Sequence, residues 1–398
     1  MTKKRLFLLA CPIYLFFYMG DALLTGYYAL NFLNRGMDEH QQSVLLGLIP
    51  FALFLGCIFF SFIARTRKRA IWLFRICALL EAGLVLGYYW CDTYVSLLIL
   101  TPLLGFFNGA PFALIEGYLV PLTEKYGGHY SNIRIFGSLG YIVSLAGGYF
   151  ILSQLPLQNS YFFSCAFFFI ALILSFFLYD HSEDDLPSRT NEDIKEKEKD
   201  RLTKTALVAA GIFIVANFFF YGVLHAATYL LPVRLRTLGF LDQDYSMARA
   251  IGVMIESGAM LLMPLLPRIT KSKFIPVYIG ASLFVAGVSM GIYFNDPWWL
   301  VYLFFAITGI GKAFLFSYQS LLLEEIVGKK ALSLVFTFTT GAINLAAAIW
   351  NLSSSWIYDA IGFQGFFIMI TVAGAAGVLL LLLLLLMKRH HKLSPVSE

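Results

Sequence analysis

Twelve apolar stretches, most of them 20 or more residues long, divide this chain of 398 residues. A helix needs about 20 mostly apolar residues to cross about 30 Å of hydrocarbon, and only helices and closed barrels satisfy every backbone polar group there. Barrel strands would be about ten residues long with alternating polarity, whereas the runs 162–179 and 373–387 are almost unbroken. We therefore expect an all-α integral membrane protein with 12 transmembrane helices.

Composition excludes several other classes of protein. Hydrophobic residues make up 59% of the chain and charged residues 13%, which leaves too little polar material to coat a large soluble domain. The five cysteines are odd in number and lie in or beside apolar runs, so they indicate core packing rather than disulfides or a metal site. The sequence contains no phosphate-binding loop, nucleophile elbow or dinucleotide fingerprint. We expect no enzyme activity, no cofactor and no ATP-driven pump.

Lysines and arginines gather in alternate loops between the apolar stretches. Cytoplasmic loops carry an excess of these residues, so both termini are expected in the cytoplasm of a multi-pass protein of the cell inner membrane. The loop at 235–248, with arginines at its edges, is the exception. This bias accounts for the net charge of +5 without a nucleic-acid partner. The basic clusters lie at 3–5, 65–69, 268–273, 329–330 and 388–392.

One long hydrophilic stretch separates six expected spans from six others. Its mixed charges are typical of a solvated linker or a short surface helix, rather than a docking site. We expect an N-terminal six-helix half at 1–180, a charged cytoplasmic linker at 181–203, a C-terminal six-helix half at 204–387 and a cytoplasmic tail at 388–398. The expected spans are 6–33, 43–64, 70–91, 95–122, 133–154, 159–180, 204–233, 245–267, 273–294, 297–326, 330–358 and 362–387.

Two segments resemble a known family. The layout of six plus six spans is similar to the major facilitator superfamily, whose halves rock about a site near the midplane. Within it, the segment from Gly105, with the pieces Asn108-Gly109-Ala110-Pro111 and Arg134-Ile135-Phe136-Gly137, resembles helices 4 and 5 of the lactose permease branch, the oligosaccharide:proton symporters. The stretch 358–365 resembles the turn between that branch's last two helices. Nucleoside:proton symporters and phenylpropionate carriers share the arginine element.

The resemblance implies roles for Glu116 and Arg134. In the permease branch an acid and an arginine 18 residues apart, as here, grip the sugar hydroxyls. The residue midway between them falls in a cytoplasmic turn, so an antiparallel helix pair would set both at similar depth. A carboxylate and a guanidinium bind each other and vicinal hydroxyls strongly. An inner-gate salt bridge, or an Arg134 side chain that reaches the headgroups, remains the alternative.

The chain departs from the permease branch in the helices that carry its proton step. That branch has an arginine in helix 9 and a histidine and a glutamate in helix 10. Here the segment 274–294 contains no charged residue, and the segment 304–310 lacks the His and Glu pair. The residues that couple protons must therefore differ from those of the permease branch, and a uniporter is the alternative.

Charged residues within the spans face the bundle interior, because their insertion into lipid costs on the order of 3 kcal/mol. Asp21 lies near the centre of the first span, on a polar aromatic stripe with Tyr14, Tyr18 and Tyr28. The superfamily's helices 1, 4, 7 and 10 line its cavity. A partly desolvated Asp21 there could bind solute or exchange a proton, or it could form a structural hydrogen bond.

In the second half, Lys312 and Glu256 lie near the middle of adjacent spans, with Gln319 seven residues after Lys312. We expect a pair between Lys312 and Glu256 that either holds this half together or, if exchanged during transport, makes Glu256 the proton carrier. It would replace the missing permease residues.

Further polar residues follow the same faces. Asn217, Tyr221 and His225 recur at four-residue steps, and His225 could titrate near physiological pH. Asn344 belongs to a polar line suited to hydroxyl recognition or helix contacts. Arg75 and Glu81, on a span that is usually peripheral, are interpreted as packing or gate contacts.

These observations favour a monomeric, proton-coupled symporter that imports a small polar solute, a sugar or oligosaccharide first. The alternatives are a symporter of nucleosides or of aromatic or other organic acids, a multidrug exporter, a uniporter, and a non-transporting receptor on the same fold. The expected partners are the solute, protons and the lipid bilayer. The expected binding residues are Glu116, Arg134, Asp21, Tyr28, Asn217, Tyr221, Gln319 and Asn344, and the expected coupling residues are Asp21, Glu256, Lys312 and His225.

Overall fold

A computed structural model describes residues 2–64, 66–127, 130–178, 204–263, 274–294 and 299–389. Every regular element in these ranges is a helix, as the apolar pattern predicts. The first six helices are α1 (Lys3–Asn34), α2 (Glu39–Ile63), α3 (Arg67–Trp90), α4 (Tyr94–Lys125), α5 (Tyr130–Leu152) and α6 (Asn159–Phe177). They are followed by α8 (Lys204–Thr237), α9 (Asp242–Leu262), α10 (Phe274–Ser289), the short 3₁₀ helix η3 (Met290–Tyr293) and α11 (Trp299–Arg389).

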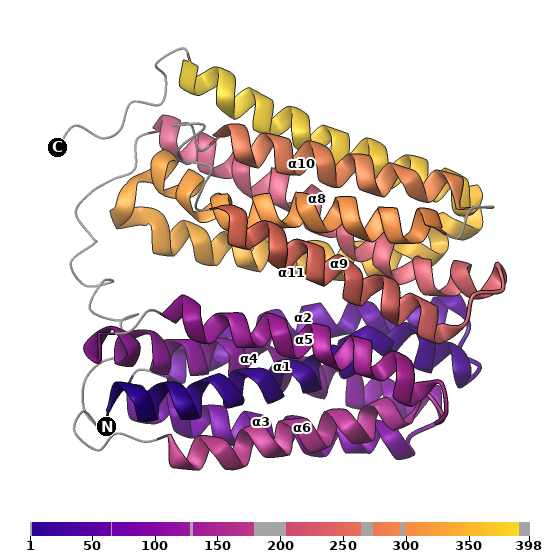
Figure 1. Cartoon of the computed structure of the whole chain (residues 1–398). Helices are drawn as coiled ribbons and strands as arrows, with labels where there is room; N and C mark the ends of the chain where they lie inside the picture. Colours follow the sequence, from indigo (N-terminus) through magenta and orange to yellow (C-terminus); the bar gives the residue numbers. More distant parts are fainter. Residues whose placement is uncertain are drawn as a thin grey trace. The chain divides into compact units, whose positions relative to one another are not determined.

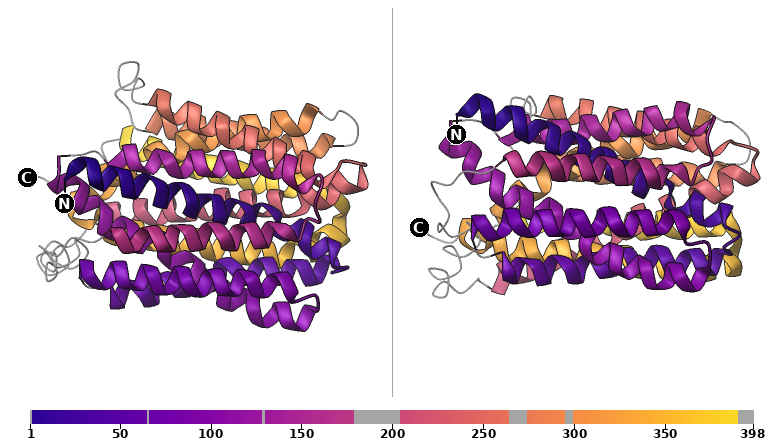
Figure 2. Two further views of the ribbon diagram at one scale, coloured as in Figure 1. Left: turned by 60° about the horizontal axis from the view of Figure 1, so that its bottom comes forward. Right: turned by 90° about the horizontal axis from the view of Figure 1, so that it is seen from below.

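The chain forms two compact units. The first comprises Met1–Glu196 and Phe240–Ala250, and the second comprises Lys197–Gly239 and Ile251–Glu398. In the first unit α1 packs against α5 and α6, while α4 packs against α2 and α3. In the second unit α11 packs against α8 and α10 (Figure 1). The helices within each unit run alongside one another in both further views (Figure 2).

The predicted domain boundaries cannot all be compared with the structure. The predicted linker at 181–203 and most of the predicted tail at 388–398 lie outside the described residues. Phe240–Ala250 follows α8 in the sequence, yet it belongs to the first unit. Division of the chain at 180 and 204 therefore stays a prediction.

Ten helical segments are long and apolar enough to cross a membrane in the described part of the chain. One of them, Phe338–Met387, has 50 residues and is long enough for two crossings. It lies in the helical stretch α11, where Gly362 has a φ of +70°, a conformation that a right-handed helix does not contain. Gly362 thus separates two of the predicted spans, and a total of twelve remains consistent with the structure.

Large apolar side chains are exposed along these helices. They include Phe59, Phe162, Ile173 and Val372, each about half exposed or more. Soluble monomers rarely present so much apolar surface, which is typical of a surface covered by another apolar phase. The exposed side chains thus fit contact with lipid.

Local sequence signals explain where several helices begin. Thr2 and Thr66 accept hydrogen bonds from the backbone amides of Arg5 and Arg69 and so cap α1 and α3. Asp38 and Gln41 form a reciprocal capping box at the start of α2. These caps satisfy amide groups that have no partner within the helix.

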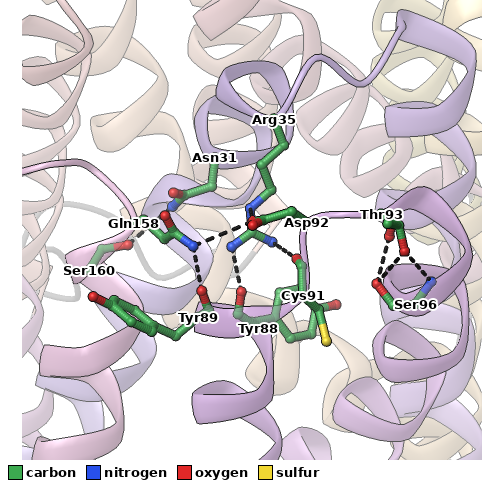
Figure 3. A network of polar contacts seen from close by, with 10 residues as sticks. All are labelled: Asn31, Arg35, Tyr88, Tyr89, Cys91, Asp92, Thr93, Ser96, Gln158 and Ser160. Atoms are coloured by element: carbon green, nitrogen blue, oxygen red, sulfur yellow. Dashed lines mark hydrogen bonds and ion pairs between the residues drawn. The ribbon is translucent and has the colours of Figure 1, made fainter.

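A polar network joins the end of α1 to α3 and α6 (Figure 3). Arg35 caps the C-terminus of α1, and Gly36, with a φ of +74°, turns the chain there. The Arg35 guanidinium donates to the carbonyl of Cys91 at 2.7 Å and to that of Tyr88. It also lies 3.4 Å from Asp92. The last carbonyls of a helix lack hydrogen-bond donors within it. Arg35 provides donors to two such carbonyls at the end of α3.

Replacement of Arg35 by alanine is expected to lower the midpoint of thermal unfolding in detergent. It would leave two carbonyls at the end of α3 without donors, at a cost of about 1–3 kcal/mol each. Asp92→Asn is the matched control, since the Asp92 side chain is 69% exposed and exposed ion pairs contribute about 0–1 kcal/mol. Equal destabilisation by the two variants would contradict the capping role.

Candidate functional site

The predicted partners Glu116 and Arg134 meet in the first unit. Arg134 Nε lies 3.6 Å from Glu116 Oε1, and the same oxygen accepts a hydrogen bond from the Tyr130 hydroxyl at 2.9 Å. Tyr130 is in turn 2.6 Å from the Tyr14 hydroxyl. Arg134 also donates to the Tyr18 hydroxyl. We call these five residues, from α1, α4 and α5, the tyrosine–arginine cluster.

A glycine makes room for this cluster. A β-carbon at Gly137 would lie 2.9 Å from the ring of Tyr18, closer than carbon atoms can pack. Arg134 is one helical turn before Gly137, so its guanidinium lies over the same ring, 4.8 Å from the centroid. The Arg134-Ile-Phe-Gly137 element thus has a physical explanation: its arginine and its glycine both accommodate Tyr18.

The charged pair of this cluster is partly exposed. The side chains of Arg134 and Glu116 are 46% and 39% exposed, whereas Tyr14 is buried. Tyr130, whose hydroxyl bonds to the buried Tyr14, holds Glu116 in place, and the exposed parts of the pair keep donors and acceptors for a ligand. A carboxylate beside a guanidinium can bind two adjacent hydroxyl groups.

A second polar group lies on α1, α3 and α4. The amide nitrogen of Asn108 on α4 is 3.5 Å from Asp21 Oδ1 on α1 and 2.5 Å from Glu81 Oε1 on α3. Glu81 is completely buried. Tyr28, within the aromatic core of this unit, interacts electrostatically with both carboxyl groups. We call Asp21 and Glu81 the acid pair.

Sequence reasoning missed Glu81 as a functional candidate. The interpretation of Arg75 as a packing residue agrees with its contacts: it donates to the Ser175 carbonyl at 2.8 Å and lies over Trp72 and Phe176. Glu81 instead points to the functional candidate Asp21 through Asn108. The available signal was the presence of Glu81 and Asn108 as two polar residues within adjacent apolar spans.

Arg249 was also missed. It belongs to the segment Phe240–Ala250 of the first unit. Its guanidinium donates to the Tyr141 hydroxyl at 2.6 Å and to the Thr25 carbonyl at 3.2 Å, and it interacts electrostatically with Asp21. Its place at the edge of an expected loop gave no reason to connect it with α1.

In the second unit, Lys312 Nζ lies 2.6 Å from Glu256 Oε2, as the sequence predicts. The two helices approach each other through glycines, because a β-carbon at Gly309 would lie 2.7 Å from the Gly252 carbonyl oxygen. Glu256 is one turn after Gly252, and Lys312 is three residues after Gly309, so the close approach brings both side chains to the same interface. Their side chains are 14% and 22% exposed.

Two further predicted residues adjoin this pair. The Tyr221 hydroxyl on α8 is hydrogen-bonded to Gln319 on α11, and Tyr221 interacts electrostatically with Glu256. The Gln319 carbonyl oxygen is buried without a hydrogen-bond partner. The second unit therefore brings together Tyr221, Glu256, Lys312 and Gln319, and Gln319 keeps one acceptor available.

The other predicted residues lie outside these groups of contacts. Asn217 and Asn344 donate to carbonyls of their own helices, those of Phe213 and Thr340. His225 is half-buried on α8, and its coupling role stays a prediction. Within the described ranges no group of three or more His, Cys, Asp or Glu side chains could hold a metal ion.

Comparison with known proteins decides the family. A family model described as Major Facilitator Superfamily matches residues 10–290 and 275–398. The chain belongs to the major facilitator superfamily. The uncharacterized transporter YwbF of Bacillus subtilis (strain 168), another protein with a similar sequence, is 20% identical over 393 residues, which cover 89% of this chain and 91% of YwbF.

Solved structures with this fold include two kinds of transporter. A variant of the nucleoside transporter NupG has a TM-score of 0.75 at 14% identity, over 94% of this chain and 99% of that chain. The peptide transporter POT in complex with sulfate has a TM-score of 0.72 at 14% identity, over 98% and 94% of the two chains. At these identities the similarity shows the fold alone.

Membership in the major facilitator superfamily confirms the predicted all-α membrane fold. This major facilitator protein is a secondary transporter rather than an enzyme, and a multi-pass membrane protein, consistent with the inner membrane.

Proposed function

We propose that this major facilitator protein imports a sugar or oligosaccharide together with protons, by alternating access, as the lactose permease branch does. The tyrosine–arginine cluster carries the proposal. It combines a charged pair suited to vicinal hydroxyls with aromatic rings, and sugars present both hydroxyl groups and apolar ring faces. A multidrug exporter would instead need a more continuous apolar lining.

Within this proposal Glu116 and Arg134 bind solute hydroxyls, with Asp21 and Tyr28 contributing from α1. In the second unit Tyr221 and Gln319 bind solute, since Gln319 keeps an unused acceptor. Asn217 and Asn344 are weaker candidates because their amides bond to their own helices. Glu256, Lys312 and Asp21 carry the proton step, with His225 as a further candidate.

A nucleoside is the second candidate solute. Its ribose offers the same pair of adjacent hydroxyls to Glu116 and Arg134, and its base could stack on an aromatic ring such as Tyr18 or Phe112, which contact each other. The fold shared with the nucleoside transporter NupG supports this alternative.

Thermal unfolding of the purified protein tests the solute class. A ligand that binds the folded state raises the unfolding midpoint, so the midpoint is measured with lactose, uridine and phenylpropionate as representatives of three classes. We expect a shift with a sugar, and one with uridine alone would favour the second candidate. Ethidium extrusion by expressing cells would favour an exporter.

Uptake into proteoliposomes tests the transport mode. For a symporter, the ligand that raises the unfolding midpoint is expected to accumulate under an imposed pH gradient. Flux down the solute gradient without accumulation indicates a uniporter, and binding without any flux indicates a receptor.

A further inference from the structure

We propose that Glu81 and Asp21 form a single proton-binding site bridged by Asn108, and that Glu81 is a proton-carrying residue of transport. The inference rests on the proton coupling proposed above and adds a residue on α3 to it. Binding of one proton changes the charge of the acid pair from minus two to minus one, and release to water reverses the change.

The bridge between the two acids is geometric. An asparagine amide nitrogen carries two hydrogens and can serve two acceptors. Asn108 Nδ2 lies 2.5 Å from Glu81 Oε1 and 3.5 Å from Asp21 Oδ1, so one amide group faces both carboxyl groups. The three side chains come from α3, α1 and α4, which places the bridge inside the first unit.

Burial argues that Glu81 holds a proton. Its side chain is 0% exposed, and its second oxygen, Oε2, is buried without a hydrogen-bond partner. An ionised carboxylate in such surroundings costs several kcal/mol unless it is paired. Two neighbouring carboxyl groups also resist ionising together, so the pair titrates as a unit.

The surrounding charges favour one proton rather than none. In the described part of the first unit, the titratable and charged groups that face the acid pair are Tyr28 of α1, Cys77 of α3, Tyr141 of α5 and Arg249 of α9. Arg249 is the cation among them, and it acts on Asp21. One arginine balances one carboxylate, so a neutral Glu81 leaves the group without net charge.

The acid pair lies close enough to the tyrosine–arginine cluster to respond to solute binding there. Asn108 and Glu116 are eight residues apart on α4, about 12 Å along the helix axis. Asp21 is three residues from Tyr18 on α1, less than one turn. A solute that shifts α1 or α4 at the tyrosine–arginine cluster therefore changes the distance between Asp21 and Asn108, and with it the free energy of ionising the pair.

Infrared spectroscopy of the full-length protein in H₂O and D₂O tests the proton on Glu81, with protons as the probe. The titration covers the range in which protein carboxyl groups ionise, about pH 3 to 9. We expect a protonated-carboxyl band that disappears in Glu81→Gln and titrates differently in Asp21→Asn. An unchanged band in Glu81→Gln would overturn the assignment.

The matched control is Tyr88→Phe. It removes the hydrogen bond between Tyr88 and Thr101, 2.5 Å long and between the same helices α3 and α4, without touching a carboxyl group. It should leave the infrared band in place. If Glu81→Gln does not fold, Asn108→Leu replaces it: loss of the bridge should make the two carboxyl groups titrate independently, and unaltered titration would contradict the shared site.

Transport in proteoliposomes tests the role of the proton. A gradient of one pH unit supports about tenfold accumulation for one proton per solute, using the solute identified by thermal unfolding. We expect this accumulation in the wild type and in Tyr88→Phe and none in Glu81→Gln, while exchange of labelled for unlabelled solute persists in all three. Replacement of sodium by choline should change nothing, and a sodium requirement would overturn the proton assignment.

The possible failures are distinguishable. Absence of accumulation in the wild type would contradict proton coupling as a whole. Accumulation in both the wild type and Glu81→Gln would leave proton coupling intact and overturn only the role of Glu81. If Glu81→Gln loses both solute exchange and accumulation, Glu81 has a structural role rather than a role in coupling.

Discussion

Arg134→Lys should lower solute uptake by about 100-fold. Arg134 contacts Glu116 and Tyr18 at once, and a lysine ammonium cannot present the planar, two-pronged donor set of a guanidinium. Loss of two charge-assisted hydrogen bonds from the guanidinium to solute hydroxyls, at about 1.5 kcal/mol each, corresponds to about 100-fold in affinity for the solute. Glu116→Gln should have a similar effect. Equilibrium binding and initial rates of uptake in proteoliposomes measure the change.

Controls separate recognition from structural support. Arg69→Lys makes the same substitution at an exposed position near the start of α3 and should leave uptake unchanged. A double variant with glutamine at 116 and 134 removes both charges together. If the pair served only to hold α4 to α5, the double variant would transport normally. We expect this double variant to have the unfolding midpoint of the wild type and to show no solute uptake.

Glu256→Gln should abolish accumulation driven by a pH gradient. The Glu256–Lys312 pair is mostly buried and 2.6 Å long, and removal of one partner of a buried pair costs about 3–5 kcal/mol because the other charge is left alone. A large fall in the unfolding midpoint is therefore expected as well. Lys312→Met should show the same fall.

The double variant distinguishes the two roles of this pair. Glu256→Gln combined with Lys312→Met removes both charges, so most of the stability should return. If the pair only stabilises the second unit, accumulation returns with it. We expect stability to recover and accumulation to stay absent, while solute exchange persists. Glu324→Gln, on the same helical stretch as Lys312, is the matched control and should resemble the wild type. Unchanged accumulation in the single Glu256→Gln variant would remove Glu256 from the coupling path.

Much of the fold could be predicted from the sequence because bilayer thickness fixes the length of an apolar helix. The two charged pairs could be predicted for related reasons. Glu116 and Arg134 are equidistant from a turn, which sets them at equal depth on antiparallel helices, and their contact is present. Glu256 and Lys312 are deep charges on adjacent helices, where an unpaired charge would be costly, and they also meet.

The rest depended on which faces of the helices touch, and the pattern of residues does not determine this. Glu81 shares no face with Arg75, so its direction was open until α3 packed against α4 and brought it to Asn108. Asn344 follows a polar line on its helix, yet its amide bonds to Thr340 one turn earlier. Arg249 belongs to a segment that joins the first unit despite its later position in the sequence.

The missing side chain of Gly137 has a consequence for recognition. The Tyr18 ring lies directly on the α5 backbone and under the Arg134 guanidinium. The side chains of Tyr18 and Arg134 therefore have little rotational freedom to lose when a solute binds. Ordering a long side chain on binding usually costs about 0.5–1.5 kcal/mol. Because Arg134 is already held against the ring of Tyr18, it avoids most of this entropic cost. Selectivity among similar solutes can therefore come from the spacing of their hydroxyl groups.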